Sequence, residues 1–275
     1  MKPSGVVTLI TDFGLEDPYV GMMKGVLLSV NPGVSIVDIS HQVRPGDMEL
    51  AAHIVAETYP FFPDGTVHVT VVDPGVGTQR RPITLITPSH LFVAPDNGIL
   101  GPVMEAIPES QTVHLKKSRY FRSNISHTFH GRDVFAPVAG HLSRGADPFD
   151  MGPIIHDPVR LKHTGPHRSG GCLYGRVRRV DHFGNLITNI SQTEMERFLD
   201  GDRPVVRIGD LTIQGLQETY GEAARGEAMA LLDSSGYLEI AVNLGRAVDR
   251  LGRDPKKVVG TEVCVERDGW VRVYS

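Results

Sequence analysis

The first 145 residues alternate between short apolar runs and helical patterns, and this alternation limits the possible folds more than any other feature of the chain. The run VVTLIT (6–11) is continuous and β-branched, as in a strand buried on both faces. Helical and strand patterns then alternate at 17–30, 35–40, 47–59 and 66–73. Alternating strands and helices form parallel sheets covered by helices. We therefore expect an α/β domain over residues 1–150, with a mostly parallel sheet sandwiched by helices.

The remaining elements of this domain follow from local signals. Asp17 is expected to cap the first helix, with Pro18 at its first position. Two further strands, a short helix and a closing helix are predicted at 82–87, 90–95, 98–107 and 132–145.

A second domain is expected after a segment in which the periodicity disappears. Pro, His and Gly accumulate over 151–170, which predicts a linker. Over 171–275, strand patterns recur at 172–180, 185–190, 205–209, 228–233, 237–242, 263–267 and 271–275, and only GRAVDRLG (245–252) is typical of a helix. This pattern predicts an antiparallel β-barrel or sandwich.

Charge and cysteine content limit the possible partners. The net charge is −4 and the isoelectric point is about 6.3, without the basic excess of a dedicated nucleic-acid binder. Cys172 and Cys264 form no C-x-x-C motif and are expected to be core thiols in a reducing compartment. The start of the chain is not typical of a signal peptide, and no apolar run approaches the ~20 residues of a membrane span. We expect a cytoplasmic protein with no membrane or nucleic-acid partner.

Acidic residues recur near the ends of the predicted strands. In sheets of this type, ligands bind beyond the carboxyl ends of the strands. If the acidic residues converge on that edge, they form a candidate site; the alternative is that each only caps its own turn. The four residues are Asp12, Asp38, Asp73 and Asp96.

Two polar motifs are further candidates. SHTFHGRD (126–133) places His130 before a helix, although Arg132 and Asp133 can simply pair with each other and His130 can fill a pocket. A zinc pair of His127 and His130 has no obvious additional ligands. DHFGN (181–185) offers an aromatic ring and a side-chain amide suited to a nucleobase, or ordinary turn chemistry. P-loop and G-x-S-x-G motifs are both missing from the sequence.

Together the motifs resemble the S-adenosylmethionine (SAM) hydroxide adenosyltransferases, or SAM hydrolases, which are relatives of SAM-dependent fluorinases and chlorinases. The resemblance runs from about residue 6 to the C-terminus and rests on TDFG (11–14), VVDPGVGTQRR (71–81), APDNG (94–98), TFHGRDVFAPVA (128–139), DHFGN (181–185) and SSGYLEIAVN (234–243). It implies an α/β domain followed by a β domain, a homotrimer, and SAM bound where one subunit's N-terminal domain meets a neighbour's C-terminal domain.

The resemblance also implies roles for individual residues. The catalytic set falls on Asp73, Arg80 and His130, for attack of water or hydroxide on C5′ of SAM with no cofactor and no metal. Arg80 is expected to hold Asp73 ionised, and either Asp73 or His130 is the base. Asp12 corresponds to the ribose contact, Phe183, Asn185 and Tyr220 to the adenine contacts, and Asp181 and Ser234 to the methionine contacts, with Asp17 nearby.

Departures from the halogenase pattern separate the two branches. Halogenases have Ser where this chain has Gly131, Tyr where it has Asp73, and Arg where it has Ser235. They also have a long insertion before the APDNG-like motif that this chain lacks. Hydroxide is therefore the expected nucleophile.

Other functions remain open at this stage. Clustered Asp12, Asp17, Asp73, Asp96 and His130 could serve a metal-dependent phosphatase or nucleoside hydrolase. The chain could also be a SAM- or adenosine-binding module without turnover, or act on another adenosyl sulfonium.

Overall fold

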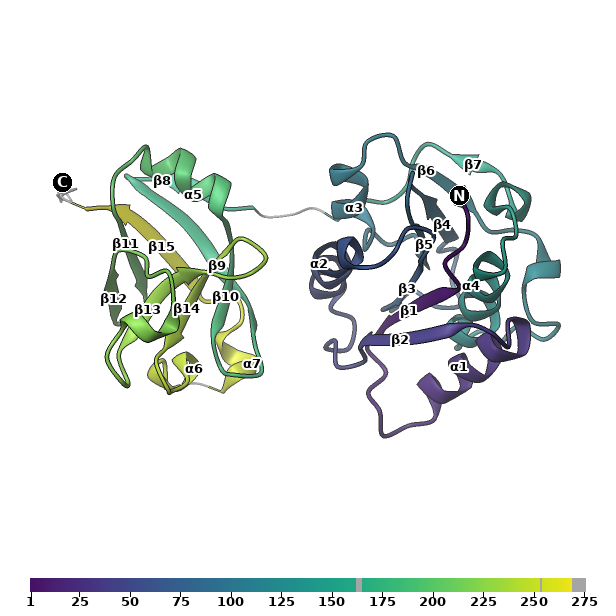
Figure 1. The fold of residues 1–275 in the computed structure, drawn as a ribbon, viewed down its shortest axis with the longest axis horizontal. Helices are drawn as coiled ribbons and strands as arrows, with labels where there is room; N and C mark the ends of the chain where they lie inside the picture. The colour runs from purple at the N-terminus through teal and green to yellow at the C-terminus, as the bar shows by residue number, and fades with distance from the viewer. Residues whose placement is uncertain (162–164, 253, 269–275) are drawn as a thin grey trace. The chain divides into compact units, whose positions relative to one another are not determined.

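The computed structural model describes residues 1–161, 165–252 and 254–268, which belong to two compact units, Met1–Lys162 and His163–Ser275 (Figure 1). Within the segment expected to be a linker, Ile154–Ile155 forms a short strand of the first unit and His167–Ser169 one of the second. In the part of the chain that the structure describes, no helix is long and apolar enough to cross a membrane.

The first unit contains a seven-stranded sheet of order β2-β1-β3-β5-β4-β6-β7. Its strands are β1 (Val6–Thr11), β2 (Ser35–Ser40), β3 (Val67–Val71), β4 (Pro82–Ile86), β5 (Leu91–Pro95), β6 (Gln111–His114) and β7 (Ile154–Ile155). The first half of the sheet, β2-β1-β3-β5, is parallel as predicted, whereas β4 runs antiparallel to β5 and to β6. Strands β6 and β7 were not predicted, because β6 has little apolar content and β7 is only two residues long.

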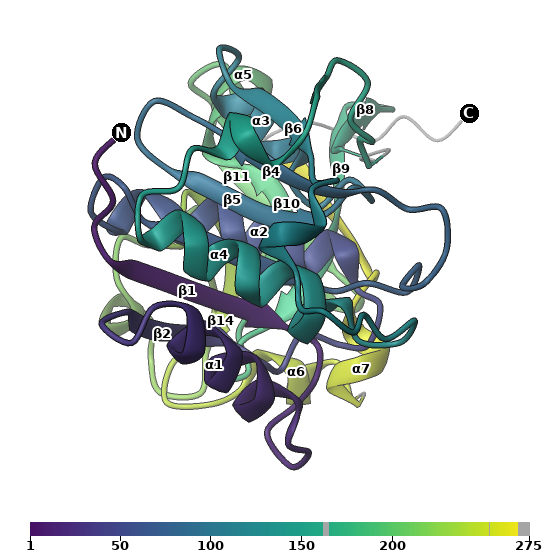
Figure 2. The ribbon, with the colours of Figure 1, turned by 90° about the vertical axis from the view of Figure 1, so that its right-hand side faces the viewer.

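Helices cover both faces of this sheet, as predicted. Figure 1 shows α1 (Tyr19–Val30) and α4 (Ala136–Ser143) on one side and α2 (Met48–Thr58) and α3 (Gly101–Ala106) on the other, and Figure 2 looks onto the face with α1 and α4. Each face has its own apolar core, and the strands supply side chains to both. This explains why the strand sequences are continuously apolar.

The start of α1 differs from the prediction. Pro18 occupies the N-cap position and no side chain caps the helix, so Asp17 lies one residue too early to act as the cap. Asp47, by contrast, caps α2 by accepting a hydrogen bond from the Leu50 amide at 3.0 Å.

The second unit is an eight-stranded antiparallel sheet. The main path is β12-β11-β15-β9-β10-β14-β13, and β8 pairs with β9. Its strands are β8 (His167–Ser169), β9 (Cys172–Val180), β10 (Leu186–Ser191), β11 (Pro204–Ile208), β12 (Leu211–Gln214), β13 (Ala228–Leu232), β14 (Tyr237–Val242) and β15 (Glu262–Arg267). Because β12 contacts β13, the two ends of the path lie side by side, and the sheet is nearly a barrel. The strand predicted at 271–275 lies outside the described residues.

The described residues of this unit include three α-helices, although only one was predicted. The expected one is α6 (Ala247–Arg250), and the others are α5 (Gln192–Leu199) and α7 (Pro255–Val258). A full capping box of Ser191 and Glu194 starts α5, so the sequence SQTE carried a signal for this helix that the strand pattern obscured.

Candidate active site

Two of the four strand-end aspartates line one pocket of about 420 Å³ in the first unit. Asp12 follows β1, and Asp73 follows β3. The other walls come from the turn before α2 and from the segment before α4. The lining residues are Asp12, Phe13, Pro45, Gly46, Val71, Asp73, Pro74, Val76, Thr128, Phe129, His130 and Gly131. A pocket of this volume suits a small-molecule ligand.

The other two aspartates are engaged elsewhere, so the expected convergence of all four is wrong. Asp38 lies within β2 and pairs with Lys24 at 2.5 Å and His41 at 3.0 Å. Asp96 accepts hydrogen bonds from Arg81 at 2.7 Å and from the Val159 amide at 2.8 Å. Each carboxylate holds a neighbouring segment of the first unit in place, which is a structural role that strand-end carboxylates often have.

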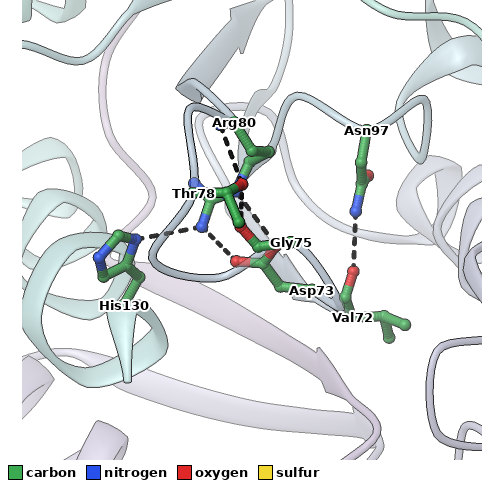
Figure 3. A network of polar contacts seen from close by, with 7 residues as sticks. All are labelled: Val72, Asp73, Gly75, Thr78, Arg80, Asn97 and His130. Carbon is green, nitrogen blue, oxygen red and sulfur yellow. Dashed lines mark hydrogen bonds and ion pairs between the residues drawn. The ribbon is translucent and has the colours of Figure 1, made fainter. Parts of the chain in front are cut away.

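Asp73, Arg80 and His130 form one polar network at the pocket (Figure 3). Arg80 donates to both carboxylate oxygens of Asp73, with Nε 3.1 Å from Oδ1 and Nη2 bonded to Oδ2. The same Nη2 lies 3.1 Å from Nδ1 of His130. The side chains of Asp73 and Arg80 are only 5% and 7% exposed, so this is a buried ion pair. The structure therefore brings together the three residues that the sequence placed in the catalytic set.

The direction of these hydrogen bonds fixes the tautomer of His130. A guanidinium only donates, so Nδ1 of His130 must be the acceptor and a neutral ring carries its proton on Nε2. Burial, together with the Arg80 charge, lowers the pKa of His130, which keeps the ring neutral. Burial also raises the pKa of Asp73, while Arg80 opposes this shift by stabilising the carboxylate. The expected effect of Arg80 is present, but burial outweighs it.

One donor of Arg80 has no partner in this network. Nη1 is buried and has no hydrogen-bond partner among the described residues. An unpaired donor of a buried guanidinium is costly, roughly 1–3 kcal/mol or more, unless a bound molecule accepts its hydrogen bond. Because Nε and Nη2 bind Asp73, Nη1 lies on the side of the guanidinium that faces away from this carboxylate, and Arg80 is not among the residues that line the pocket.

The loop that carries Asp73 and Arg80 is held against the segment that carries His130. Gly77 has a φ of +76°, and a Cβ atom there would lie 2.2 Å from the carbonyl oxygen of His127. Only glycine allows this approach. Thr78 closes the same loop by donating to the Gly75 carbonyl at 2.7 Å.

The residues after His130 form a π-helix, Gly131–Phe135. Asp133 is fully buried there and accepts hydrogen bonds from Arg132 at 2.7 Å and from the Ser126 amide at 2.9 Å. The pairing of Arg132 with Asp133 thus has a structural role, and it fixes the backbone that presents His130. Single π-helical turns occur frequently at functional sites.

An aromatic cluster forms one wall of the pocket. The Phe13 and Phe129 rings are 5.8 Å apart, and Tyr19 lies 5.3 Å from Phe129. A Cβ atom on Gly131 would lie 3.2 Å from Sδ of Met23 and 3.3 Å from the Phe129 ring, so a larger residue would crowd this wall. Asp17 is exposed and does not line the pocket.

In the second unit, the DHFGN segment forms the turn between β9 and β10. Asp181 accepts hydrogen bonds from the backbone amide of Asn185 at 2.8 Å and from its side-chain amide at 3.2 Å. Phe183, at the tip of the turn, is 71% exposed. The turn therefore presents an aromatic face to its surroundings, which suits stacking against a nucleobase.

A second acidic group that the sequence did not indicate lies near this turn. Glu239 on β14 is 3% exposed and accepts a hydrogen bond from the Tyr220 hydroxyl at 2.9 Å. Burial, with Asp181 and Asp233 nearby, raises the pKa of Glu239, and burial and the hydrogen bond to Glu239 raise that of Tyr220 to about 12. Ser234 is exposed in the next turn. The available signal was Glu239 itself, an acidic residue inside an apolar strand.

Family models match both units of the chain. The model described as the SAM hydroxide adenosyltransferase N-terminal domain covers residues 7–152, and the model of the C-terminal domain covers residues 175–260. The chain belongs to the SAM hydroxide adenosyltransferase family. The resemblance inferred from the motifs is thus confirmed.

Curated relatives divide into two groups. An (R)-S-adenosyl-L-methionine hydrolase of Salinispora tropica is 38% identical over 93% of this chain and 97% of the relative. One of Thermus thermophilus is 37% identical over 92% and 96%. A fluorinase of an Actinoplanes species is more distant, with 30% identity over 86% of this chain and 91% of the fluorinase.

The fold also occurs in solved structures. An uncharacterized conserved protein from Thermotoga maritima has a TM-score of 0.87 and 37% identity over 95% of this chain and 100% of that one.

The alternative of a metal site formed by clustered carboxylates at the pocket is not favoured. Asp96 accepts a hydrogen bond from Arg81, and Asp17 is exposed and is not among the residues that line the pocket. Among the described residues, one group of three possible metal ligands from His, Cys, Asp or Glu has its ligand atoms within 4.8 Å of each other. This group lies in the second unit.

Proposed function

We propose that this protein hydrolyses SAM to adenosine and L-methionine. The observation that carries the proposal is the buried network of Asp73, Arg80 and His130 at the pocket. The family to which the chain belongs includes curated SAM hydrolases. SAM carries a sulfonium, which is already a strong electrophile, so the protein mainly has to position a desolvated nucleophile in line with the C5′–S bond.

The arrangement supports a division of labour among the three residues. A water molecule in the pocket can lie beside the Asp73 carboxylate, whose orientation Arg80 fixes. Asp73 then accepts a proton from this water as its oxygen attacks C5′. The C5′–S bond breaks and its electron pair stays on sulfur, which becomes the neutral thioether of methionine. Asp73 is a better base than His130, because Nδ1 of His130 accepts from Arg80 and Nε2 carries the ring proton.

The halogenase reaction fits these residues less well. Asp73, with its negative charge, repels a halide ion, whereas it orients water and accepts its proton. Gly131 offers no hydroxyl to contact a halide, and the most similar relatives reported above are hydrolases. SAM hydrolysis therefore fits this chain better than SAM halogenation does.

We assign the substrate contacts on the same basis. Asp12 binds the ribose hydroxyls, Phe183, Asn185 and Tyr220 the adenine, and Asp181 and Ser234 the methionine part, with Asp17 near it. The second unit's contacts would come from a neighbouring subunit of a homotrimer in the cytoplasm. Specific activity that falls on dilution, in step with loss of the trimer, is the expected result for a shared site.

The test is to incubate the purified protein with SAM, with and without EDTA, chloride or fluoride, and to separate the products by chromatography. We expect adenosine and methionine in equal amounts, no effect of EDTA, and no halogenated adenosine. Asp73→Asn should lower kcat by roughly 10²–10⁴-fold, the usual contribution of a general base. Asp38→Asn is the matched control, because Asp38 pairs with Lys24 away from the pocket. SAM recovered intact with the wild-type protein would contradict the proposal.

A further inference from the structure

Two thiols and a carboxylate meet on one face of the second unit's sheet. Cys172 is on β9, and Cys264 and Glu266 are on β15. The antiparallel register of these strands pairs Tyr174 with Cys264 and Leu173 with Val265, which places Cys172 opposite Glu266. Because side chains alternate along a strand, all three project from the same face of the sheet. The sequence predicted core thiols, and both cysteines are buried.

The distances among the three groups match those around a bound metal ion. Sγ of Cys172 lies 3.6 Å from Oε1 of Glu266, and Sγ of Cys264 lies 3.9 Å from the same oxygen. All three ligand atoms lie within 4.8 Å of each other. In a tetrahedral zinc site with Zn–S near 2.3 Å and Zn–O near 2.0 Å, sulfur and oxygen are about 3.5 Å apart. An ion can therefore bind with only small side-chain movements.

The charges of the surroundings suit a divalent ion bound by two thiolates. Nε of Arg207 donates to Oε2 of Glu266 at 2.8 Å, so this carboxylate is already held by a cation on one oxygen. A divalent ion, two thiolates, one carboxylate and one guanidinium sum to zero net charge. Neutral thiols with the Glu266–Arg207 pair also sum to zero. Among these groups, binding thus leaves no uncompensated charge, provided that two protons leave.

We propose that Cys172, Cys264 and Glu266 form a binding site for a thiophilic divalent cation, with Zn²⁺ as the best match. The ion replaces one proton on each thiol, forms two Zn–S bonds and one Zn–O bond, and releases two protons to solvent. Water completes the coordination. The site joins β9 to β15 and is separate from the pocket of the first unit.

The experiment uses the full chain, stripped with a chelator and reduced with a phosphine. Titration with Cd²⁺ and Co²⁺ should give thiolate-to-metal charge-transfer absorption and, for Co²⁺, the intense visible bands of tetrahedral coordination. The chain contains only two cysteines, so any such band comes from Cys172 and Cys264. Zn²⁺ should bind one ion per chain in competition with a coloured chelator. Calorimetry in two buffers of different ionisation enthalpy should show release of two protons.

Matched variants distinguish this site from adventitious surface binding. Cys172→Ser and Cys264→Ser should each abolish the charge-transfer band, and Glu266→Gln should weaken Zn²⁺ binding at least about tenfold, a loss that even supporting groups commonly cause. Glu262→Gln is the control, because Glu262 is an exposed carboxylate at the start of β15. Circular dichroism checks that each variant is folded.

A measurement on the unaltered chain keeps the proposal testable if the variants fail to fold. Zn²⁺ should protect both thiols of the reduced protein from alkylation. The proposal is wrong if alkylation is unaffected by Zn²⁺, if Co²⁺ binds only octahedrally, or if both serine variants bind Zn²⁺ as well as the unaltered chain does. A Cys172–Cys264 disulfide that forms in air, with no metal bound after reduction, would likewise overturn it.

Discussion

Each unit buries a carboxylate near the candidate substrate contacts, but the surroundings of the two carboxylates differ. In the first unit, the Arg80 guanidinium donates hydrogen bonds to both carboxylate oxygens of Asp73. In the second, Glu239 receives a neutral phenol from Tyr220, and Asp181 and Asp233 lie near enough to raise its pKa further. Arg179 opposes this shift, but the pKa of Glu239 stays raised.

This difference indicates which kind of molecule each carboxylate can interact with. The charge of Asp73 is paired within the protein, which is compatible with its proposed role of orienting and deprotonating a neutral water molecule. Acidic groups lie near Glu239, so a cation that binds there stabilises their negative charges. SAM supplies positive charge in its sulfonium and amino groups. We therefore expect substitutions in the first unit to act mainly on kcat, and those around Glu239 to act mainly on KM.

The largest effect is expected from Arg80→Ala. It removes the partner of a buried carboxylate, and breaking such a pair typically lowers the free energy of unfolding by about 3–5 kcal/mol. It also releases the Asp73 carboxylate from its fixed orientation, and misplacement of a catalytic group should lower kcat by roughly 10²-fold. Urea unfolding and single-turnover kinetics measure the two effects.

The double variant Asp73→Asn with Arg80→Met separates these two effects, because it has no buried charge. It should recover much of the stability and none of the activity. Recovery of activity together with stability would mean that the pair is only structural.

Acid should destabilise the first unit more than the second. His68 on β3 is 1% exposed, accompanied by His90, and burial lowers its pKa from 6.5 to about 3. The unfolded chain therefore binds more protons than the folded one between pH 6.5 and pH 3, and the first unit loses about 1.4 kcal/mol per pH unit as the pH falls through that window. The raised pKa of Glu239 has the reverse sign, since its folded form gains a proton more readily.

Hydrogen exchange at pH 7 and pH 5 measures this contrast. Protection of the β3 and β5 amides should fall more than that of β9 and β10. His182→Gln, at an exposed histidine of the second unit, should leave the pH dependence unchanged. Equal loss in both units would show that His68 does not dominate the acid response.

A smaller effect is expected from Glu239→Gln. Removing one negative charge near the substrate cation should raise the KM for SAM about tenfold, equivalent to ~1.4 kcal/mol, with kcat nearly unchanged. In the unaltered protein, KM should rise as the pH falls through the raised pKa of Glu239, while kcat falls through the raised pKa of Asp73. Tyr220→Phe keeps the carboxylate and should raise KM less. A change confined to kcat in Glu239→Gln would contradict the comparison.

The sequence predicted the parallel half of the first sheet well, because that half depends on local patterns, whereas the proximity of Asp73, Arg80 and His130 was expected from the family resemblance. Continuous apolar runs mark strands covered on two faces, and the Asp73–Arg80 pair lies within one loop that Gly77 shapes. Long-range partners were not predictable. Whether a strand-end carboxylate faces a pocket or a distant arginine depends on tertiary placement, so Asp12 and Asp96 looked alike in sequence. Glu239 was missed for the same reason: its partner Tyr220 is on a separate segment.

The smallest effect is expected from Gly131→Ser, which introduces the residue that halogenases have at this position. The new Cβ would meet Sδ of Met23 at 3.2 Å and the Phe129 ring at 3.3 Å, and crowding of this kind costs about 1–3 kcal/mol of folding stability. The backbone there needs no positive φ, so the fold should survive. Because Asp73 and Arg80 are unchanged, the variant should still release adenosine, at a reduced rate, and should form no halogenated adenosine in chloride or fluoride.

Gly131→Ala is the matched control, since it adds the same Cβ without a hydroxyl. Equal rates for the two variants would assign the loss to crowding. Halogenated product from Gly131→Ser alone would show that the serine hydroxyl, rather than the charge at Asp73, decides between water and halide.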